Sequence, residues 1–474
     1  MSYLVSPPRP YLEEGTFMRF EPRAAEFRGM NVLGFGTPEG PCCLFNLEKL
    51  ILGAGNGVPS LPLLLRLFLT RVPSPRRHHL FGVSKKWRAP ISCAQKRWGR
   101  AYTSVMIVPT GVGASIGGFA GDALPVARAF ASVVDNLISH PNVLNAAMLF
   151  WPMPNVLYVE GFALDMFAQG LWALRPVHQN KVGLVLDAGM EEDLRVRHLQ
   201  VADATRASLG LPVVEYIVTD TPLQVEKWIE PESGQSTGRI RQPGSLLRAV
   251  EKLVNSSGID AVAVVGRFPD DDAEEFVDYR QGKGIDILAG VEAVISHLVV
   301  EKFCLPCAHA PALLPLPLDS SLCPKSAAEE IGFTFLPCVL AGLSKAPQYL
   351  VTTAGSVGTD CLVASDVDSL VLPIDACGGI GSLAFANSDR KKRPLIIAVK
   401  ENETVLDDTP DKIGIDALVV SNYWEALGVI AAHKAGIDPL SMRKDATKRI
   451  RQFSSSMLTS NRQRVEVEQM VSVI

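Results

Sequence analysis

The stretch that decides the fold covers Ser104 to Gly161 and reads SVMIVPTGVGASIGGFAGDALPVARAFASVVDNLISHPNVLNAAMLFWPMPNVLYVEG. The apolar run Val105–Val108 predicts a buried strand, and the glycine-rich turn after it leads into a helix predicted over Asp122–Ser139. A strand, a glycine turn and a helix in this order form the basic unit of α/β proteins. The stretch therefore predicts an α/β fold.

The same alternation of apolar runs and helical patterns continues as far as Ala435. The further predicted strands are Met148–Phe150 or Val156–Val159, then Val182–Leu186, Val213–Val218, Ala261–Val265, Tyr349–Thr352, Ser369–Ile374, Leu395–Val399 and Ala417–Val420. The further predicted helices are Glu160–Leu174, Glu191–Leu209, Pro222–Ile229, Pro243–Asn255, Gly284–Glu301 and Asn422–Ala435. Because the strands are apolar throughout, we expect them to be buried on both faces. The predicted fold class is a doubly wound α/β fold with a mostly parallel sheet, helices on both faces and, as an option, two lobes.

Composition divides the chain into four parts. Residues 1–100 form an N-terminal extension that we expect to be mostly disordered, and residues 441–474 form a C-terminal tail. Between them, residues 101–345 form an α/β lobe with a first glycine-rich loop, and residues 346–440 form an α/β lobe with a second.

The net charge of −4 hides an asymmetry between the N-terminal extension and the rest. Residues 1–100 carry 15 Lys and Arg against 6 Asp and Glu, which leaves the remaining residues with a net charge of −13. No acidic residue lies between Glu48 and Asp122, and an arginine-rich, acid-free segment is typical of organelle transit peptides. A basic arm that contacts nucleic acid or anionic lipid is the alternative. The acidic residues before this segment do not fit a transit peptide, which should begin the chain.

The first glycine-rich loop, Thr110–Asp122, lies between a predicted strand and a predicted helix. At this place backbone N–H groups and a helix N-terminus can hold an anion. The loop is not the dinucleotide-binding fingerprint, because Ile116 occupies the place of the third glycine. A plain tight turn is the alternative. The predicted ligand-binding residues of this loop are Thr110, Gly111, Gly113, Gly117, Gly118 and Asp122.

The second glycine-rich loop, Asp375–Ser382, also follows an apolar strand. Catalytic groups of α/β proteins gather at the carboxyl ends of strands. If Cys377 opens a helix, the helix dipole should lower the pKa of its thiol, whereas the alternative is a small buried cysteine in a tight turn. Asp375 and Cys377 are predicted to be catalytic, and Gly378, Gly379, Gly381 and Ser382 are predicted to bind ligand. We expect both loops to face one pocket.

Four more candidates lie at or near the ends of predicted strands and in the proline-rich segment after residue 303. Asp187 and His309 are predicted to be catalytic, and Glu401 and Asn402 are predicted to bind ligand. His309 follows Cys304 and Cys307, which are zinc-ligand types, but a structural zinc site needs a fourth ligand. We therefore predict no metal, and we expect the nine cysteines to be mostly free thiols.

The segment Asn136–Val159 is uncharged and about long enough to cross a bilayer. Its Pro and Asn residues would leave backbone groups unpaired in lipid, so no membrane span is predicted. His140, Asn142 and Asn145 stand there among apolar residues, where they either satisfy buried backbone groups or line a pocket. We predict that Asn142 and Asn145 bind ligand.

Four strings resemble a family of unknown function found in cyanobacteria and plant chloroplasts. They are Val108–Arg128 (VPTGVGASIGGFAGDALPVAR), Ser139–Asn145 (SHPNVLN), Trp151–Gly161 (WPMPNVLYVEG) and Pro306–Pro311 (PCAHAP). The resemblance extends from about Thr103 to Leu440 and implies a location in the chloroplast stroma, in agreement with the basic segment. It implies no catalytic residues, because the family has no established activity.

Two functional hypotheses follow. The first is an enzyme that binds a small anionic metabolite or nucleotide between the two loops and uses Cys377 in isomerase-, racemase- or transferase-like chemistry. The second is a non-catalytic plastid binding or assembly factor with an enzyme-like fold. The sequence identifies no cofactor and leaves open whether the protein forms a homo-oligomer. A nucleic-acid partner is not expected, because the negative net charge of the residues after 100 would repel phosphate groups.

Overall fold

The computed structural model describes residues 100–145, 152–270, 277–330, 335–352, 358–444, 446–447 and 449–450, together with two strands before residue 45. The chain divides into two compact units, residues 1–94 and residues 95–474. In the first unit, strand β1 (Leu33–Thr37) pairs antiparallel with β2 (Gly40–Leu44). The basic segment and the residues after 450 lie outside the described residues, so what the sequence predicts for them stays a prediction.

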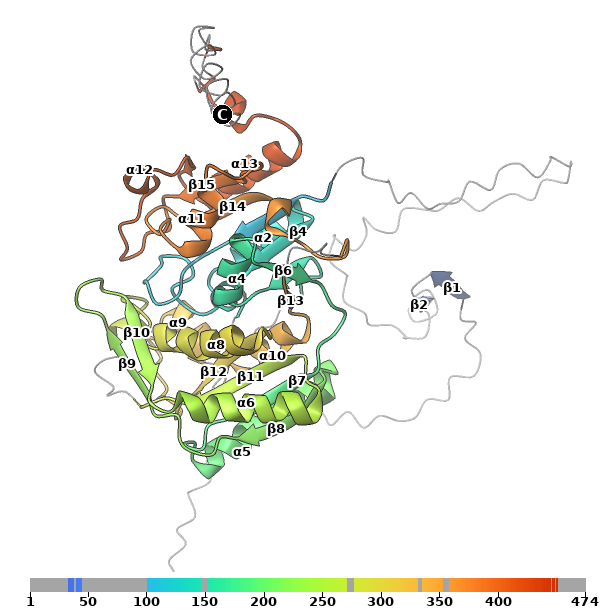
Figure 1. Cartoon of the computed structure of the whole chain (residues 1–474), viewed down its shortest axis with the longest axis vertical. Helices are drawn as coiled ribbons and strands as arrows, with labels where there is room; N and C mark the ends of the chain where they lie inside the picture. Colours follow the sequence, from blue (N-terminus) through green and yellow to red (C-terminus); the bar gives the residue numbers. More distant parts are fainter. Residues whose placement is uncertain are drawn as a thin grey trace, which may run out of the picture. The chain divides into compact units, whose positions relative to one another are not determined.

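The larger sheet of the second unit is parallel and has the strand order β16-β15-β14-β3-β4-β5. Its strands are β3 (Thr103–Met106), β4 (Asn136–Ser139), β5 (Val156–Tyr158), β14 (Val367–Pro373), β15 (Leu395–Val399) and β16 (Leu418–Val420). Strand β14 pairs with β3, so the beginning and the end of the unit share one sheet (Figure 1). The lobe boundary predicted at residues 345/346 therefore does not separate two sheets.

The smaller parallel sheet has the order β12-β11-β7-β8. Its strands are β7 (Val182–Leu186), β8 (Val213–Val218), β11 (Ala261–Arg267) and β12 (Cys307–Ala312). Strand β12 was not predicted, because the proline-rich segment around Pro311 is typical of a connection between elements. The strand lies at the edge of the sheet, where a residue without an N–H group is tolerated.

Two antiparallel pairs complete the strands of this unit that the structure describes. Strand β6 (Trp172–Arg175) pairs with β13 (Gln348–Val351), and β9 (Val225–Ile229) forms a hairpin with β10 (Ser236–Ile240).

The helices form layers on both faces of each parallel sheet. They are α2 (Leu124–Val133), α3 (Pro141–Leu144), α4 (Gly161–Ala168), α5 (Glu192–Leu209), α6 (Pro243–Ser257), α7 (Val277–Arg280), α8 (Ala289–Phe303), α9 (Pro324–Glu330), α10 (Leu336–Ser344), α11 (Ile380–Ala386), α12 (Pro410–Ile413) and α13 (Tyr423–Lys434). Helices α2 and α13 pack on one face of the larger sheet, and α5 and α10 pack on one face of the smaller sheet. The other two faces share a core with α4, α6, α8 and α11. The predicted α/β fold with helices on both sheet faces is confirmed.

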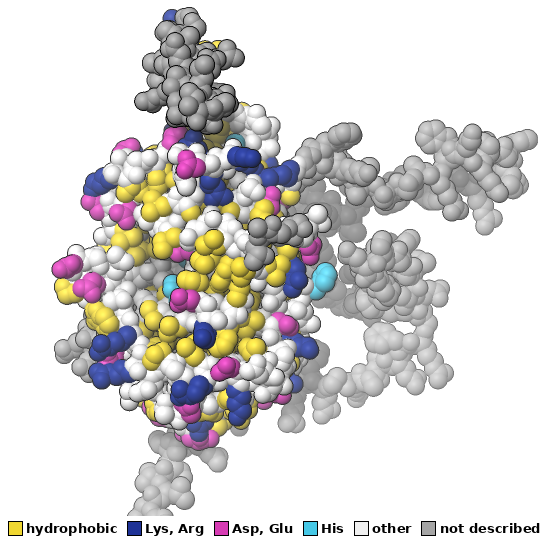
Figure 2. Space-filling model, in the orientation of Figure 1, with side chains coloured by type: hydrophobic (Ala, Val, Ile, Leu, Met, Phe, Trp, Pro, Cys, Tyr) yellow, Lys and Arg dark blue, Asp and Glu magenta, His cyan; other side chains and the backbone are white. Residues whose placement is uncertain are grey.

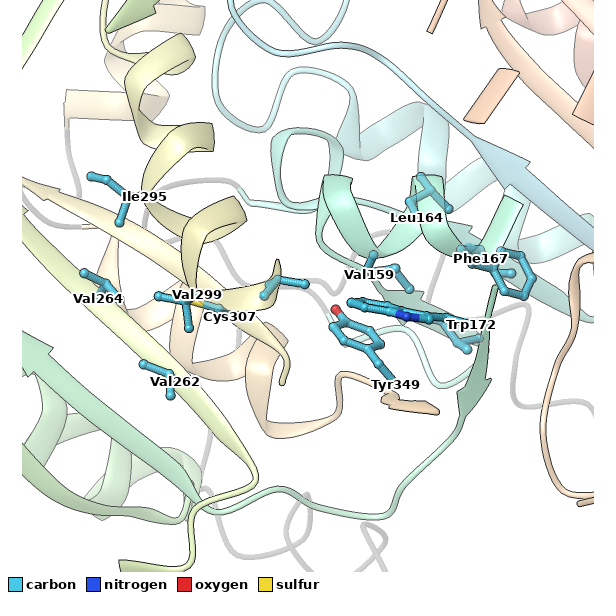
Figure 3. Packing of buried hydrophobic residues seen from close by; sticks show 14 of the residues in the cluster. Val159, Leu164, Phe167, Trp172, Val262, Val264, Ile295, Val299, Cys307 and Tyr349 are labelled. Atoms are coloured by element: carbon cyan, nitrogen blue, oxygen red, sulfur yellow. The ribbon is translucent and has the colours of Figure 1, made fainter. Parts of the chain in front are cut away.

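The shared core joins the two sheets. Figure 3 shows Leu164 and Phe167 of α4 near the rings of Trp172 and Tyr349, with residues of β11 and α8 in the same view. The Trp172 and Tyr349 rings are stacked, with their centroids 5.6 Å apart. On the face seen in Figure 2, hydrophobic side chains of the described residues gather across the middle, and acidic and basic side chains are interspersed above and below.

Three predicted helices were wrong in whole or in part. The segment predicted as a helix at Pro222–Ile229 instead contains β9, whose partner β10 lies beyond a turn. The helix predicted at Asp122–Ser139 ends at Val133, because the residues that follow form β4 between β3 and β5. The helix predicted at Glu160–Leu174 ends at Ala168, and its last residues belong to β6.

The segment weighed as a membrane span contains β4, α3 and β5 among its described residues. Across the part of the chain that the structure describes, no helix is both long and apolar enough to cross a membrane.

Candidate functional site

A cavity of about 970 Å³ lies where the carboxyl ends of β3, β4 and β5 face helix α8 and strand β12. The loop after β3, helix α3, the start of α4, and α7, α8 and α9 all contribute to its wall. In parallel sheets, the carboxyl ends of the strands are the usual place for ligands. The cavity is therefore the first candidate for a functional site.

Glu160 and His297 form an ion pair at the cavity wall. The Glu160 Oε1 atom lies 2.9 Å from His297 Nε2, and the other carboxylate oxygen caps helix α4 by accepting the Phe162 N–H at 2.9 Å. The side chain of Glu160 is 3% exposed and that of His297 is 43% exposed. Burial disfavours the charged imidazole, but the hydrogen bond to Glu160 and its charge together raise the pKa of His297.

A second histidine lies next to this pair. His309 Nδ1 is 3.2 Å from Ser296 Oγ, and its Nε2 is 3.5 Å from Glu292 Oε2. Ser296 Oγ is in turn 3.5 Å from Glu160 Oε1. Glu292 and Ser296 are four residues apart on α8, so the helix presents both side chains on one face. The contacts connect two histidines and two carboxylates along one wall.

Buried acids form another part of the wall. Burial, followed by the charge of Glu292, raises the pKa of Asp286 to about 7. Burial and the charge of Asp286 raise the pKa of Glu329 well above its usual value. Glu329 accepts the Tyr279 hydroxyl at 2.8 Å and also the Ala120 N–H. Asp286 can therefore carry a proton near neutral pH, and the pKa of Glu329 is shifted in the same direction.

The cavity wall is acidic overall. Its described residues include seven Asp or Glu and a single Arg, namely Glu160, Asp270, Asp286, Glu292, Asp319, Glu329 and Glu330 against Arg280. Arg280 is paired with Glu330 at 2.8 Å. Even with Asp286 and Glu329 protonated, the other five carboxylates outnumber Arg280 and a protonated His297, so the electrostatic potential favours a neutral or cationic group over an anion.

The first glycine-rich loop reaches the cavity only in part. Of the residues predicted to bind ligand in this loop, Thr110 and Gly118 line the cavity, whereas Gly111, Gly113, Gly117 and Asp122 do not. Asp122 pairs with Lys325 Nζ at 2.8 Å and accepts the Gly117 N–H.

Other N–H groups of the same loop are also used inside the protein. The Ser115 N–H donates to the Glu403 carbonyl at 2.9 Å, and the Ile116 N–H donates to Asn402 Oδ1 at 2.9 Å. These N–H groups of the loop therefore already have partners inside the protein. Asn402 also donates to the Ile116 carbonyl, and Glu401 accepts the Tyr423 N–H at 2.6 Å. Of the two residues predicted to bind ligand after β15, Asn402 thus holds the loop in place, whereas Glu401 binds the start of helix α13.

None of the described lining residues comes from the second glycine-rich loop. Asp375 accepts the N–H and hydroxyl groups of Thr404, each at 2.9 Å, and the Gly381 N–H donates to Asp165 at 2.8 Å. Gly378, Gly379 and Ser382 also lie outside the cavity wall. The segment around Thr404 contacts both loops, so they share an edge of the sheet, but the second loop contributes nothing to the wall of this cavity.

The condition for a lowered thiol pKa, that Cys377 opens a helix, is not met, and Cys377 is the small buried cysteine of the alternative. Cys377 is fully buried, and burial followed by the charges of Asp375 and Asp408 raises the pKa of its thiol to about 12. Cys377 precedes helix α11 instead of opening it, so it gains nothing from the helix dipole. None of the six cysteines after residue 300 forms a disulfide. No group of three or more metal-ligating side chains is arranged to hold a metal among the residues that the structure describes.

Asp187 is buried away from the cavity and bonds only to backbone groups. Its carboxylate accepts the Gly189 and Leu223 N–H groups at 2.9 Å each and the Arg267 N–H at 3.0 Å. These three bonds connect the end of β7 to the start of the β9 hairpin and to the end of β11. The geometry is that of a structural carboxylate.

We expect Asp187→Asn to lower the free energy of unfolding by about 2 kcal/mol, because its NH₂ group cannot accept one of these buried N–H groups. Urea denaturation measures the change, and Asp389→Asn on an exposed loop is the control. A fully stable Asp187→Asn protein would contradict the structural role.

Several predicted residues do meet in the cavity. His309, Asn142, Asn145, Thr110 and Gly118 all line it. The sequence did not indicate the groups on α8 or the buried acids, since a Glu or a His in an amphipathic helix usually faces solvent. The four-residue spacing of Glu292 and Ser296 was the available signal.

Comparisons with known proteins confirm the resemblance to a family of unknown function and add a cyanobacterial relative. An uncharacterised lipoprotein of Synechococcus sp. is 53% identical over 345 residues, which cover 73% of this chain and 94% of that protein. No solved structure matches the chain. A family model described as "Protein of unknown function (DUF3326)" matches residues 103–443. The chain therefore belongs to the DUF3326 family.

Proposed function

We propose that this protein is an enzyme that performs general acid–base chemistry on a small polar molecule bound in the cavity. The observation that carries the proposal is the Glu160–His297 pair, with a 2.9 Å contact between a buried carboxylate and a half-exposed imidazole. A histidine whose pKa is raised by a carboxylate can donate a proton near neutral pH and take it back. His309 supplies a second imidazole in the same wall.

The acidic wall supports a neutral or cationic substrate rather than the small anion expected from the sequence. Asp286 and Glu329, with their raised pKa values, supply carboxylic acids that can donate a hydrogen bond or lose a proton to a bound base. Thiol chemistry at Cys377 has no support from the geometry, because the thiol lies outside the cavity wall. The proposed reaction is therefore an imidazole–carboxyl reaction, and its proposed location is the chloroplast stroma.

A ligand screen separates this enzyme from a non-catalytic assembly factor. A ligand that binds the native state raises the midpoint of thermal unfolding by mass action. We expect neutral or cationic metabolites to stabilise the protein more than sugar phosphates or nucleotides do. No stabilisation by any small molecule would contradict the proposal.

We expect Glu160→Gln to lower turnover of a substrate found in the screen about a hundredfold, because the variant removes the charge that holds a proton on His297. The amide oxygen of the new residue can still cap α4, so the fold should be kept. NMR titration should show a fall in the pKa of His297 even before a substrate is known. Glu251→Gln on the exposed side of α6 is the matched control. Unchanged turnover with an unchanged pKa of His297 would contradict the assigned role.

A further inference from the structure

His140 is held in one tautomer by the end of the first strand. Its Nε2 atom accepts the Val108 N–H at 3.0 Å, and the residue is 8% exposed. An imidazole nitrogen that accepts a hydrogen bond carries no proton, so the neutral ring has its proton on Nδ1. Burial lowers the pKa of His140 to about 4, which keeps the ring neutral near pH 7.

The Nδ1–H group of His140 is free to bind a ligand. Among the described residues no side chain or backbone group accepts a hydrogen bond from it. The Nδ1 atom is also not one of the fully buried polar atoms that lack a hydrogen-bond partner. His140 lines the cavity, which is the accessible space beside it. The nearly buried imidazole of His140 thus offers a neutral N–H donor to the cavity, while its Nε2 atom is already bonded to Val108.

Two further donors lie in the same wall. Asn145 Oδ1 accepts the Tyr158 hydroxyl at 3.1 Å, which leaves the Asn145 NH₂ group without a partner among the described residues. The Thr110 hydroxyl also has no partner within the part of the chain that the structure describes. All three residues follow the carboxyl ends of neighbouring strands or the short helix α3 after them.

We propose that His140 and Asn145 form a binding site for the carbonyl oxygen of a neutral substrate, with His140 as the hydrogen-bond donor to that oxygen. This rests on the proposed acid–base function and names its substrate class as uncharged carbonyl compounds. The acidic wall disfavours a carboxylate or phosphate in the same place. Leu288, Pro311 and Leu313 supply an apolar surface for the hydrocarbon part.

The chemistry that follows is proton removal from the carbon next to the carbonyl group. A base of the Glu160–His297 or His309 group takes the proton, the C–H electron pair forms a carbon–carbon double bond, and the carbonyl π electrons move to oxygen. The His140 N–H and the Asn145 NH₂ donate to the resulting enolate oxygen without transferring a proton. Return of the proton to the same or another carbon completes the cycle, so no oxidant or co-reactant is needed.

The test uses cyclopentanone as the probe and cyclopentene, which lacks the oxygen, as its matched control. We expect cyclopentanone, and not cyclopentene, to shift the ¹⁵N and ¹H resonances of His140 Nδ1–H in the full chain. His140→Gln places its amide where Nε2 was, so it keeps an acceptor for Val108 but loses the Nδ1 donor. His140→Asn places its amide near Nδ1 and keeps a donor. We expect His140→Gln to weaken cyclopentanone binding about five- to tenfold and His140→Asn to weaken it less.

Equal responses to cyclopentanone and cyclopentene in the wild-type protein would overturn the assignment, and so would a proton on Nε2 of His140. The NMR spectrum reports the tautomer directly, so the test does not depend on the folding of either variant. Loss of turnover in Glu160→Gln with carbonyl binding retained is expected if both proposals hold. Retained turnover in that variant would remove the acid–base role and leave the carbonyl site standing.

Discussion

Raising the pH from about 4 to about 8 is expected to lower the free energy of unfolding by about 2 to 4 kcal/mol through Asp286. Burial and the neighbouring Glu292 raise the pKa of this carboxyl group to about 7 in the folded protein. Because the folded state binds the proton more tightly than the unfolded state, stability is lost as the pH rises between the two pKa values. Water in the cavity screens part of this effect, since Asp286 lines the wall.

Asp286→Asn should remove this loss, because the amide cannot ionise. Its free energy of unfolding, measured by urea denaturation across the same pH range, should exceed that of the wild type at about pH 8. The buried Glu329 should also ionise more readily once the charge of Asp286 is gone. Asp416→Asn in an exposed loop is the control. Parallel pH profiles for wild type and Asp286→Asn would contradict the assignment.

Gly290→Ala is expected to lower the free energy of unfolding by about 3 kcal/mol. Gly290 lies in the first turn of α8, and a Cβ atom there would come 2.0 Å from the Ser236 carbonyl oxygen and 2.6 Å from Thr237 Cα. Both contacts are to the backbone of β10, so no side chain can move away to make room. The Gly290 N–H also donates to Ser236 Oγ at 2.9 Å, which depends on the same close approach.

Gly428→Ala is the matched control for this effect. Gly428 lies inside α13, and a Cβ atom there would meet no other atom within 4 Å. Replacing glycine by alanine in an open helix position should raise the free energy of unfolding by about 1 kcal/mol. Urea denaturation of both variants should therefore give changes of opposite sign, and equal changes would contradict the packing of β10 on α8.

The site could be predicted from the sequence only where its residues lie next to one another in the chain. His140, Asn142 and Asn145 fall in one uncharged segment, and both readings of that segment hold. His140 satisfies the buried Val108 N–H, Asn142 donates to the Val108 carbonyl at 3.0 Å, and all three line the cavity. The second glycine-rich loop looks equally suitable in the sequence, but its carboxylate and N–H groups are used by Thr404 and Asp165.

The sequence by itself determined the α/β class and the positions of strands such as β7 and β15, because a continuous apolar run requires burial on both faces whatever its neighbours are. Only the tertiary structure decided that β3 pairs with β14, that β9 and β10 form a hairpin, and that α8 brings Glu292, Ser296 and His297 to His309 and Glu160. These contacts join residues up to hundreds of positions apart, so local sequence patterns contain no signal for them. The raised pKa values of Asp286 and Glu329 likewise depend on the tertiary structure, because burial in the assembled cavity is their main cause.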